Sequence, residues 1–350
     1  MTLIYFIVIL GLTVFVHELG HFIFAKKSGV HCYEFSIGMG PKIFSFKGKK
    51  GDETTYSIRL LPIGGYVQMA GEEVELDNNI PDEKRMQSKS FIQRFLIMIA
   101  GALNNFILGI LIIFIMSLIY GSYDNKPYID SVEKNSSVYN IIEKGDLVTK
   151  VNDVKVNTID DVLLQFQLID NNEVIDLTIK DGKETKTVEL KPILEEDTYV
   201  YGISLSNTKT HGIMNAITYT FSEFISVFKS MYIVIVNLIT GNLGVDSLAG
   251  PVRIYNAIGE QAKYGFENVM YIAGFISINV GFVNLLPFPA LDGGRILFLI
   301  IEKIRRKTIN VKVENIVNMI GFSLLMLLVV FITIKDVIKL FWGEVYGRIY

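Results

Sequence analysis

Four long stretches of this sequence are almost entirely apolar, and each could cross a lipid bilayer as a helix, which takes roughly 20 residues. They are Thr2–Ala25, Phe95–Tyr123, Asn268–Leu291 and Asn315–Ile334. Half of all residues are hydrophobic, a composition typical of membrane proteins. We therefore expect a polytopic α-helical membrane protein with four spans.

A fifth apolar stretch, Ser230–Val245, has no charge but only 16 residues, and Glu223 and Lys229 precede it. A helix with charges at this spacing is more typical of a segment that lies along the membrane surface than of one that crosses it. We therefore expect residues 207–265 to form an interfacial amphipathic region.

The first stretch contains the motif His17-Glu18-x-x-His21. These are the only Asp, Glu, His, Lys or Arg residues between Met1 and Ala25. On a helix, residues four apart share one face, which is the spacing at which two imidazoles bind one zinc ion with the adjacent glutamate as general base. Ionisable side chains are costly within a membrane span and usually mark a functional site.

A catalytic zinc site needs a third protein ligand, and the candidates are Asp292, His31, Cys32 and His211. Of these, Asp292 alone lies at the end of an apolar span. It reaches the depth of the two histidines if the first and third spans run in the same direction, which requires that residues 215–245 do not cross the membrane.

Two prolines and two glycines between Asn284 and Arg295 should unwind the end of the third span. Irregular backbone at membrane depth is tolerated where it lines a cavity. The alternative for Asp292 is a helix cap near the membrane surface.

After the first span, residues 33–46, 54–61 and 66–69 alternate in polarity, which predicts β-strands. The edge of such a sheet can bind an extended peptide as an added strand, or the region is a plain hairpin. Residues 72–90 are charged and polar, which predicts a flexible loop. In the second span, interhelical hydrogen bonds would explain the amides Asn104 and Asn105.

Residues 124–206 have the pattern of a small soluble α+β module. A helix is expected at Ile159–Leu168, and the expected strands are Tyr128–Val132, Leu147–Val151, Val174–Ile179 and Thr185–Leu190.

Charge indicates the orientation of the chain. Residues 26–50 carry six lysines, and the segment after the third span is also basic, whereas residues 121–210 hold 17 acidic and 10 basic residues. Basic short loops mark the cytoplasmic side, so we expect the N-terminus and the module to be extracytoplasmic and the histidines to lie nearer the cytoplasm. Cys32 is the single cysteine, which leaves no partner for an intrachain disulfide, and we expect a reduced thiol.

These motifs resemble the bacterial site-2 proteases, the intramembrane zinc metalloproteases of the RseP/RasP type. The resemblance rests on His17-Glu18-x-x-His21 and on Asn284-x-x-Pro287-x-Pro289-x-Leu291-Asp292-Gly293, with support from residues 35–41 and 61–67. One departure is a missing proline in the second span, where the sequence reads Gly101-Ala102-Leu103-Asn104-Asn105 and Asn105 matches the family's asparagine.

The resemblance implies zinc bound by His17, His21 and Asp292, with Glu18 as the catalytic base. It also implies that Asn284 hydrogen-bonds the substrate backbone or the developing oxyanion, although a helix-capping role is an alternative. The module would be a PDZ-like domain that meets peptides or trimmed substrate ends. The implied domain layout is a first span at 1–25, a β region and loop at 26–94, a second span at 95–123, the module at 124–206, the interfacial region at 207–265, a third span at 266–307, and a fourth span with a tail at 308–350.

The implied function is regulated intramembrane proteolysis of single-span membrane proteins, such as anti-sigma factors or signal-peptide remnants, in the bacterial plasma membrane, with no nucleic-acid partner. A zinc transporter and an inactive scaffold are the rival interpretations. The glutamate next to the first histidine argues against the transporter, and the full set of ligands and base argues against the scaffold.

Overall fold

A computed structural model describes residues 1–49, 52–72, 80–169, 172–182, 184–195, 198–206, 209–244 and 248–346. The chain divides into two compact units, one formed by Met1–Ile112 and Val245–Tyr350 and the other by Ile113–Gly244. Residues 73–79 of the loop expected at residues 72–90 lie outside the described residues. The rest of the expected loop holds two short 3-10 helices, η2 (Asp82–Lys84) and η3 (Met86–Ser88).

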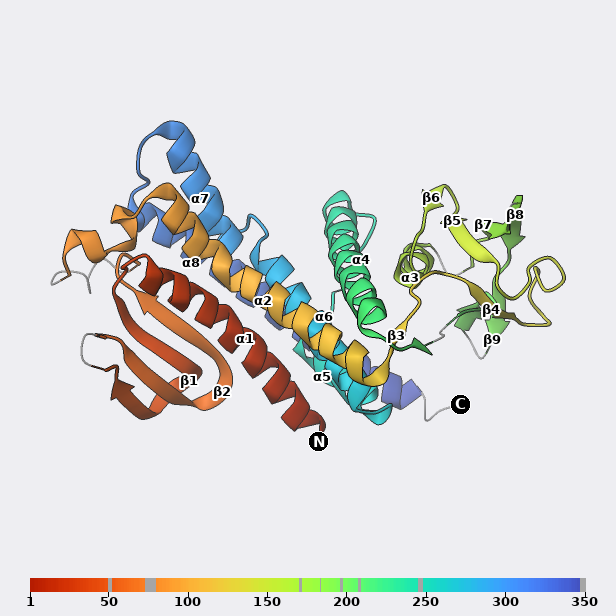
Figure 1. Ribbon diagram of the computed structural model, residues 1–350, viewed down its shortest axis with the longest axis horizontal. Coiled ribbons are helices and arrows are strands. Elements are labelled where there is room, and N and C mark those ends of the chain that lie inside the picture. Colours follow the sequence, from red (N-terminus) through yellow and green to blue (C-terminus); the bar gives the residue numbers. More distant parts are fainter. Residues whose placement is uncertain are drawn as a thin grey trace. The chain divides into compact units, whose positions relative to one another are not determined.

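The first unit contains most of the long helices (Figure 1). These are α1 (Thr2–Lys27), α2 (Phe91–Tyr120, whose last residues belong to the second unit), α5 (Pro251–Lys263), α6 (Phe266–Asn284), α7 (Asp292–Arg305) and α8 (Val311–Tyr346). By length and composition, α1, α2, α6 and α8 could each cross a membrane, and they correspond to the four expected spans. The sequence did not predict α5, and α2 begins four residues earlier than expected.

Contacts between α1, α2 and α6 fix their relative directions. Along α1 and α2, His21 meets Ile97 whereas Val16 meets Asn104, so these two helices are antiparallel. A Cβ at Gly109 would meet Ile278, and one at Gly281 would meet Phe106, so α2 and α6 are antiparallel as well. It follows that α1 and α6 run in the same direction.

The strands β1 (Cys32–Lys47) and β2 (Thr55–Met69) pair antiparallel and lie beside α1 (Figure 1). Both strands bend, because Ser36 is the register partner of Tyr66 on one side and of Ser57 on the other. Residues 65–69 thereby form an outer edge next to α1, where the backbone N–H of Val67 donates to Glu18. The β region expected after the first span is confirmed.

A buried polar cluster holds the middle of this sheet together. Glu34 accepts hydrogen bonds from Ser57 and Arg59 and pairs with Lys42 at 2.8 Å. Burial by itself would raise the pKa of the Glu34 carboxyl, but these bonds lower it to about 2. Cys32 is buried at the start of β1, and burial raises the pKa of its thiol to about 12, which keeps it protonated and unreactive.

The second unit contains the α+β module expected at residues 124–206. Its central sheet has the order β6-β5-β7-β8, with β5 (Leu147–Val151), β6 (Val154–Lys155), β7 (Ile175–Asp181), β8 (Glu184–Leu190) and the helix α3 (Ile159–Leu168). Short pairs of strands complete it: β4 (Ile129–Val132) with β11 (Ile203–Leu205), β9 (Ile193–Glu195) with β10 (Thr198–Val200), and β3 (Ser122–Tyr123) with β12 (Lys209–Thr210). The expected helix and strands are confirmed within about two residues, around a continuous apolar core.

Helix α4 (Ile213–Thr240) also belongs to the second unit and packs on α3. With 28 residues it is longer than the uncharged stretch, and by length and composition it is a fifth helix that could cross a membrane. One face carries exposed apolar side chains at a spacing of three or four residues: Met214, Ile217, Phe221, Ile225, Phe228, Tyr232, Val236 and Ile239. The expectation that this segment lies along the membrane surface stays a prediction.

Candidate metal centre

The two histidines of the motif meet on one face of α1, near its C-terminal end. Their Nε2 atoms are 3.2 Å apart, and only 8% of His17 and 7% of His21 is exposed. A helix places residues four apart one above the other, so the spacing in the sequence is sufficient to bring these rings together.

Asp292 reaches the two histidine rings from the start of α7. Its Oδ2 atom is 3.1 Å from Nε2 of His17 and 3.2 Å from Nε2 of His21. Asp292 is the first residue of α7, after a break at residues 285–291 that ends α6. At Gly293 a Cβ would lie 2.2 Å from the carbonyl oxygen of Leu286, so only glycine permits the tight turn that directs Asp292 toward the histidines.

These three atoms have the spacing of ligands to one metal ion. In a tetrahedral zinc site with bonds of about 2.0–2.1 Å, neighbouring ligand atoms are about 3.3 Å apart, close to the distances of 3.1–3.2 Å found here. Asp292 Oδ2 is also buried and, within the described part of the chain, has no hydrogen-bond partner of acceptable geometry. A buried carboxylate oxygen in that state is stabilised by a cation, so the residues fit a zinc ion.

The other nitrogens of both rings have partners on α2. His21 Nδ1 lies 2.7 Å from the carbonyl oxygen of Ile97, which requires Nδ1 to carry the proton and leaves Nε2 free as a ligand. His17 Nδ1 lies 3.3 Å from the amide of Asn105, whose own oxygen is buried and lacks a partner among the described residues. An amide rotated by half a turn satisfies both groups, so that the Asn105 oxygen accepts from His17 Nδ1 and Nε2 is again free.

Gly101 keeps the metal-facing side of the rings open. A Cβ at this position would lie 2.3 Å from His21 Nε2 and 2.8 Å from His17 Nε2. Asn105 follows four residues later, so Gly101 and Asn105 face α1 from the same side of α2. The sequence drew attention to this stretch for its missing proline and its two amides, and it gave Gly101 no role at the metal.

Glu18 lies between the histidines and the β-sheet. Its Oε2 accepts a hydrogen bond of 3.1 Å from the N–H of Val67 on β2, and the residue is half-buried. A carboxylate fixed through one oxygen keeps a defined orientation for the other. No feature of the sequence indicated that a strand would hold the glutamate.

The remaining candidates lie elsewhere. The amide N–H of Asn284 donates to the carbonyl oxygen of Val280 in its own helix at 3.0 Å, and His31 contacts Glu53 at 2.9 Å. Asn104 donates to the carbonyl oxygen of Val16 at 3.2 Å, which is the interhelical role expected for it. Among the described residues, His17, His21 and Asp292 form the one group of three potential ligands that could hold a metal ion.

Comparison with known proteins agrees with this chemistry. The family model for peptidase family M50 matches residues 5–328. The chain belongs to peptidase family M50. It is a zinc metalloprotease of the site-2 protease family, as the resemblance implied.

Individual relatives match almost the whole chain. A protein from Clostridium perfringens is 40% identical over 342 residues, covering 97% of this chain and 99% of that one. The regulator of sigma-W protease RasP of Bacillus subtilis is 32% identical, with 97% and 99% covered, and the zinc metalloprotease RasP of Bacillus licheniformis is 33% identical, with the same coverage. A PDZ domain from a Listeria monocytogenes protein covers 23% of this chain and 87% of its own, at 17% identity and a TM-score of 0.21, so the PDZ-like assignment stays a prediction.

Proposed function

We propose that this protein hydrolyses peptide bonds inside the transmembrane segments of single-span membrane proteins. The observation that carries the proposal is the convergence of His17 and His21, in the apolar helix α1, with Asp292 at the start of α7, beside Glu18 and an outer strand. A protease that acts on soluble substrates would not need its catalytic groups inside the membrane.

His17, His21 and Asp292 are the proposed zinc ligands, and Glu18 is the proposed catalytic base. Bound zinc would supply Lewis acidity and an activated water. Glu18 would serve as the base that holds the proton of the attacking water and passes it to the leaving amine. The hydrogen bond from Val67 holds one oxygen of the carboxylate, so the other oxygen performs the proton transfer.

The outer strand at residues 65–69 is the proposed substrate-binding edge. A transmembrane helix satisfies its own backbone hydrogen bonds, so it must unwind locally before a peptide bond can be attacked. The edge of a strand offers new backbone partners to the unwound segment. Asn284 uses one amide N–H for Val280, and its second N–H is proposed to bind the substrate backbone or the oxyanion.

We place α4 on the extracytoplasmic membrane surface, which gives the protein four spans. Because α2 is antiparallel to both α1 and α6, the chain leaves α2 and enters α6 on the same side, so the connecting segment crosses the membrane an even number of times. Helix α5, with 13 residues, is too short to cross. If α4 crossed the membrane, the connection would therefore contain no second crossing to bring the chain back to the side on which α6 begins.

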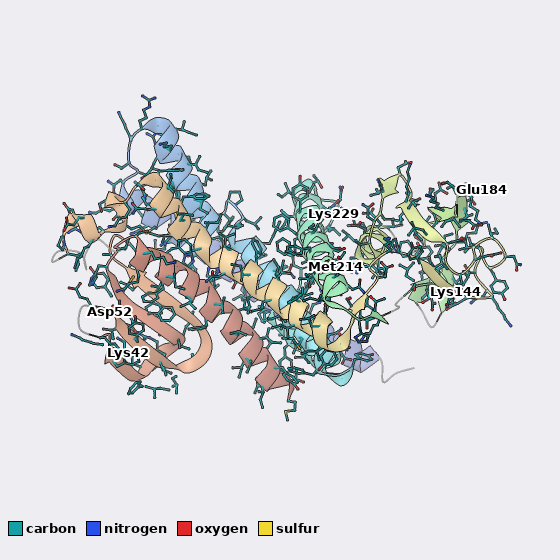
Figure 2. All side chains as sticks on the ribbon, in the orientation of Figure 1. Lys42, Asp52, Lys144, Glu184, Met214 and Lys229 are labelled. Atoms are coloured by element: carbon teal, nitrogen blue, oxygen red, sulfur yellow. The ribbon has the colours of Figure 1, made fainter. Side chains whose placement is uncertain are left out.

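Contacts in the middle of α4 support the same placement. Lys229 pairs with Asp161 at 2.6 Å, Ser226 donates to Asp160 at 3.0 Å, and the fully buried Glu223 accepts from Asn125 (Figure 2 labels Lys229). If α4 crossed the bilayer, these polar contacts between α4 and the module would lie at the centre of the membrane, where charged groups are costly. Reporter tags at Lys209 and Lys263 should lie on the same side, and tags on opposite sides would refute the placement.

The module at residues 124–206 is proposed to be a PDZ-like filter on the outer surface, which meets peptides or the trimmed ends of substrates. One relative is named a regulator of sigma-W protease, and anti-sigma factors or signal-peptide remnants are the substrate classes we propose for this chain. The lipid bilayer and single-span proteins are its proposed partners.

The test is to map the cleavage site. Full-length protein in liposomes is incubated with a single-span substrate, and the products are identified by mass spectrometry. We expect cleavage inside the apolar segment, faster when that segment contains Asn or Gly than when it is all Leu and Ala, because local unwinding precedes attack. Cleavage confined to the soluble flanks would contradict the proposal.

A further inference from the structure

An open cavity of about 480 Å³ lies between the start of α2 and the end of α7, outside the metal centre. Its walls include four basic side chains, Arg94, Lys303, Arg306 and Lys307, and its apolar residues are Phe91 and Leu299. The proposed proteolysis uses none of these residues.

The one acid in this wall is already neutralised. Glu302 pairs with Arg94 at 2.6 Å, where both side chains are almost buried, and its other oxygen accepts from the N–H of Ile309 at 2.8 Å. The remaining three cations therefore give the cavity a net charge of about +3. Arg94 Nε is also buried and has no hydrogen-bond partner among the described residues.

The cations are arranged around the end of α7. Arg306 ends the helix in the left-handed conformation, with φ 53°, and Lys303 Nζ sits 5.4 Å from the centre of the Phe91 ring. Like charges that line one cavity repel one another, and the end of a helix attracts cations only weakly. An anion bound among them would relieve this repulsion.

The cavity also lies where a lipid headgroup would be. Exposed apolar side chains flank Arg94 and Lys303 along both helices: Ile92 and Leu96 on α2, and Ile300 and Ile304 on α7. Exposed apolar residues on a spanning helix such as α2, and on a helix packed beside it, face acyl chains, and a basic pocket at the end of the spanning helix suits a lipid phosphate. Phe91 and Leu299 provide an apolar floor for the glycerol backbone.

We propose that this cavity binds the phosphate of an anionic phospholipid, with Lys303, Arg306 and Lys307 as its ligands. On the proposed topology the lipid belongs to the cytoplasmic leaflet. The lipid bridges α2 to α7, the helix that carries Asp292 at its other end.

The chain offers a matched control. Arg305, at the same helix end, and Lys312, at the start of α8, are exposed basic residues outside the cavity wall. The double variants Lys303→Gln with Lys307→Gln, and Arg305→Gln with Lys312→Gln, remove the same charge. Full-length protein in neutral detergent is titrated with dioctanoyl phosphatidylglycerol and, separately, with dioctanoyl phosphatidylcholine, and bound lipid is counted by native mass spectrometry.

We expect wild type to prefer phosphatidylglycerol. Each basic residue near a lipid phosphate contributes about fivefold in affinity, so the cavity variant should bind phosphatidylglycerol about 30-fold more weakly, while the control variant changes less than about threefold. Equal weakening in both variants, or no preference between the lipids, would overturn the proposal. Inorganic phosphate that displaces the lipid at equal concentration would assign the cavity to a soluble anion and overturn the lipid assignment.

Discussion

Gly101 gives the sharpest test of the metal centre, because a single methyl group would occupy space that the ion needs. In Gly101→Ala the new Cβ would lie 2.3 Å from His21 Nε2 and 2.8 Å from His17 Nε2. Ordinary contacts begin at 3.4 Å, so the methyl overlaps Nε2 of His21 by about 1.1 Å, and this nitrogen must be accessible to bind zinc.

The histidines cannot move away without further loss. Rotation of His21 would break its 2.7 Å hydrogen bond with the Ile97 carbonyl, which costs about 1–3 kcal/mol when the partner is left buried. Changes that only disturb the outer partners of a metal ligand reduce affinity about 10–100-fold. We therefore expect Gly101→Ala to weaken zinc binding by at least about 100-fold and to abolish cleavage.

The assay is zinc affinity by competition with a chromophoric chelator, with total zinc measured by mass spectrometry. Gly109→Ala is the matched control, since its Cβ would meet Ile278 at 2.5 Å and the Gly274 carbonyl at 2.9 Å, a similar clash on the same helix away from the ligands. The control should keep its zinc even if it unfolds at a lower temperature. Wild-type zinc affinity in Gly101→Ala would refute the proposed site geometry.

Three further predictions concern the site and the β-sheet. Asp292→Asn should bind zinc much more weakly, and unchanged metal content would show that Asp292 is not a ligand. Asn105→Leu, which keeps the shape but removes the acceptor for His17, should lower zinc affinity about 10–100-fold, and unchanged affinity would remove Asn105 from this role. Because the folded-state pKa of Glu34 is depressed to about 2, its contribution to stability is complete above pH 4.5 and disappears as the pH falls toward 2. The thermal unfolding temperature of Glu34→Gln should lose that part of the pH dependence. Identical profiles of unfolding temperature against pH for wild type and variant would contradict this prediction.

Much of the fold follows from local pattern. The spans of the first unit follow from the length of apolar stretches, and the strands and helix of the module follow from their periodicity. The break between α6 and α7 follows from prolines and glycines that cannot continue a helix. Helix α5 was missed because its 13 residues are amphipathic and its only strong signal is Pro251 at its start.

The metal centre was only partly predictable. His17, Glu18 and His21 share a local motif. Asp292 was singled out by its place at the end of an apolar span, but its meeting with the histidines depends on the parallel directions of α1 and α6, which no local pattern encodes. The roles of Gly101 and Asn105 depend on the register between α1 and α2. Their spacing of four residues was visible in the sequence, but the helix that they face was not.

The most direct measurement of the central claim compares wild type with Glu18→Gln in two assays, zinc content and cleavage of a single-span substrate by purified protein in detergent. Wild type should hold about one zinc ion per chain and cleave, and Glu18→Gln should hold the same zinc and not cleave. Loss of zinc in the variant would make Glu18 a ligand, and cleavage by the variant would contradict its role as the catalytic base.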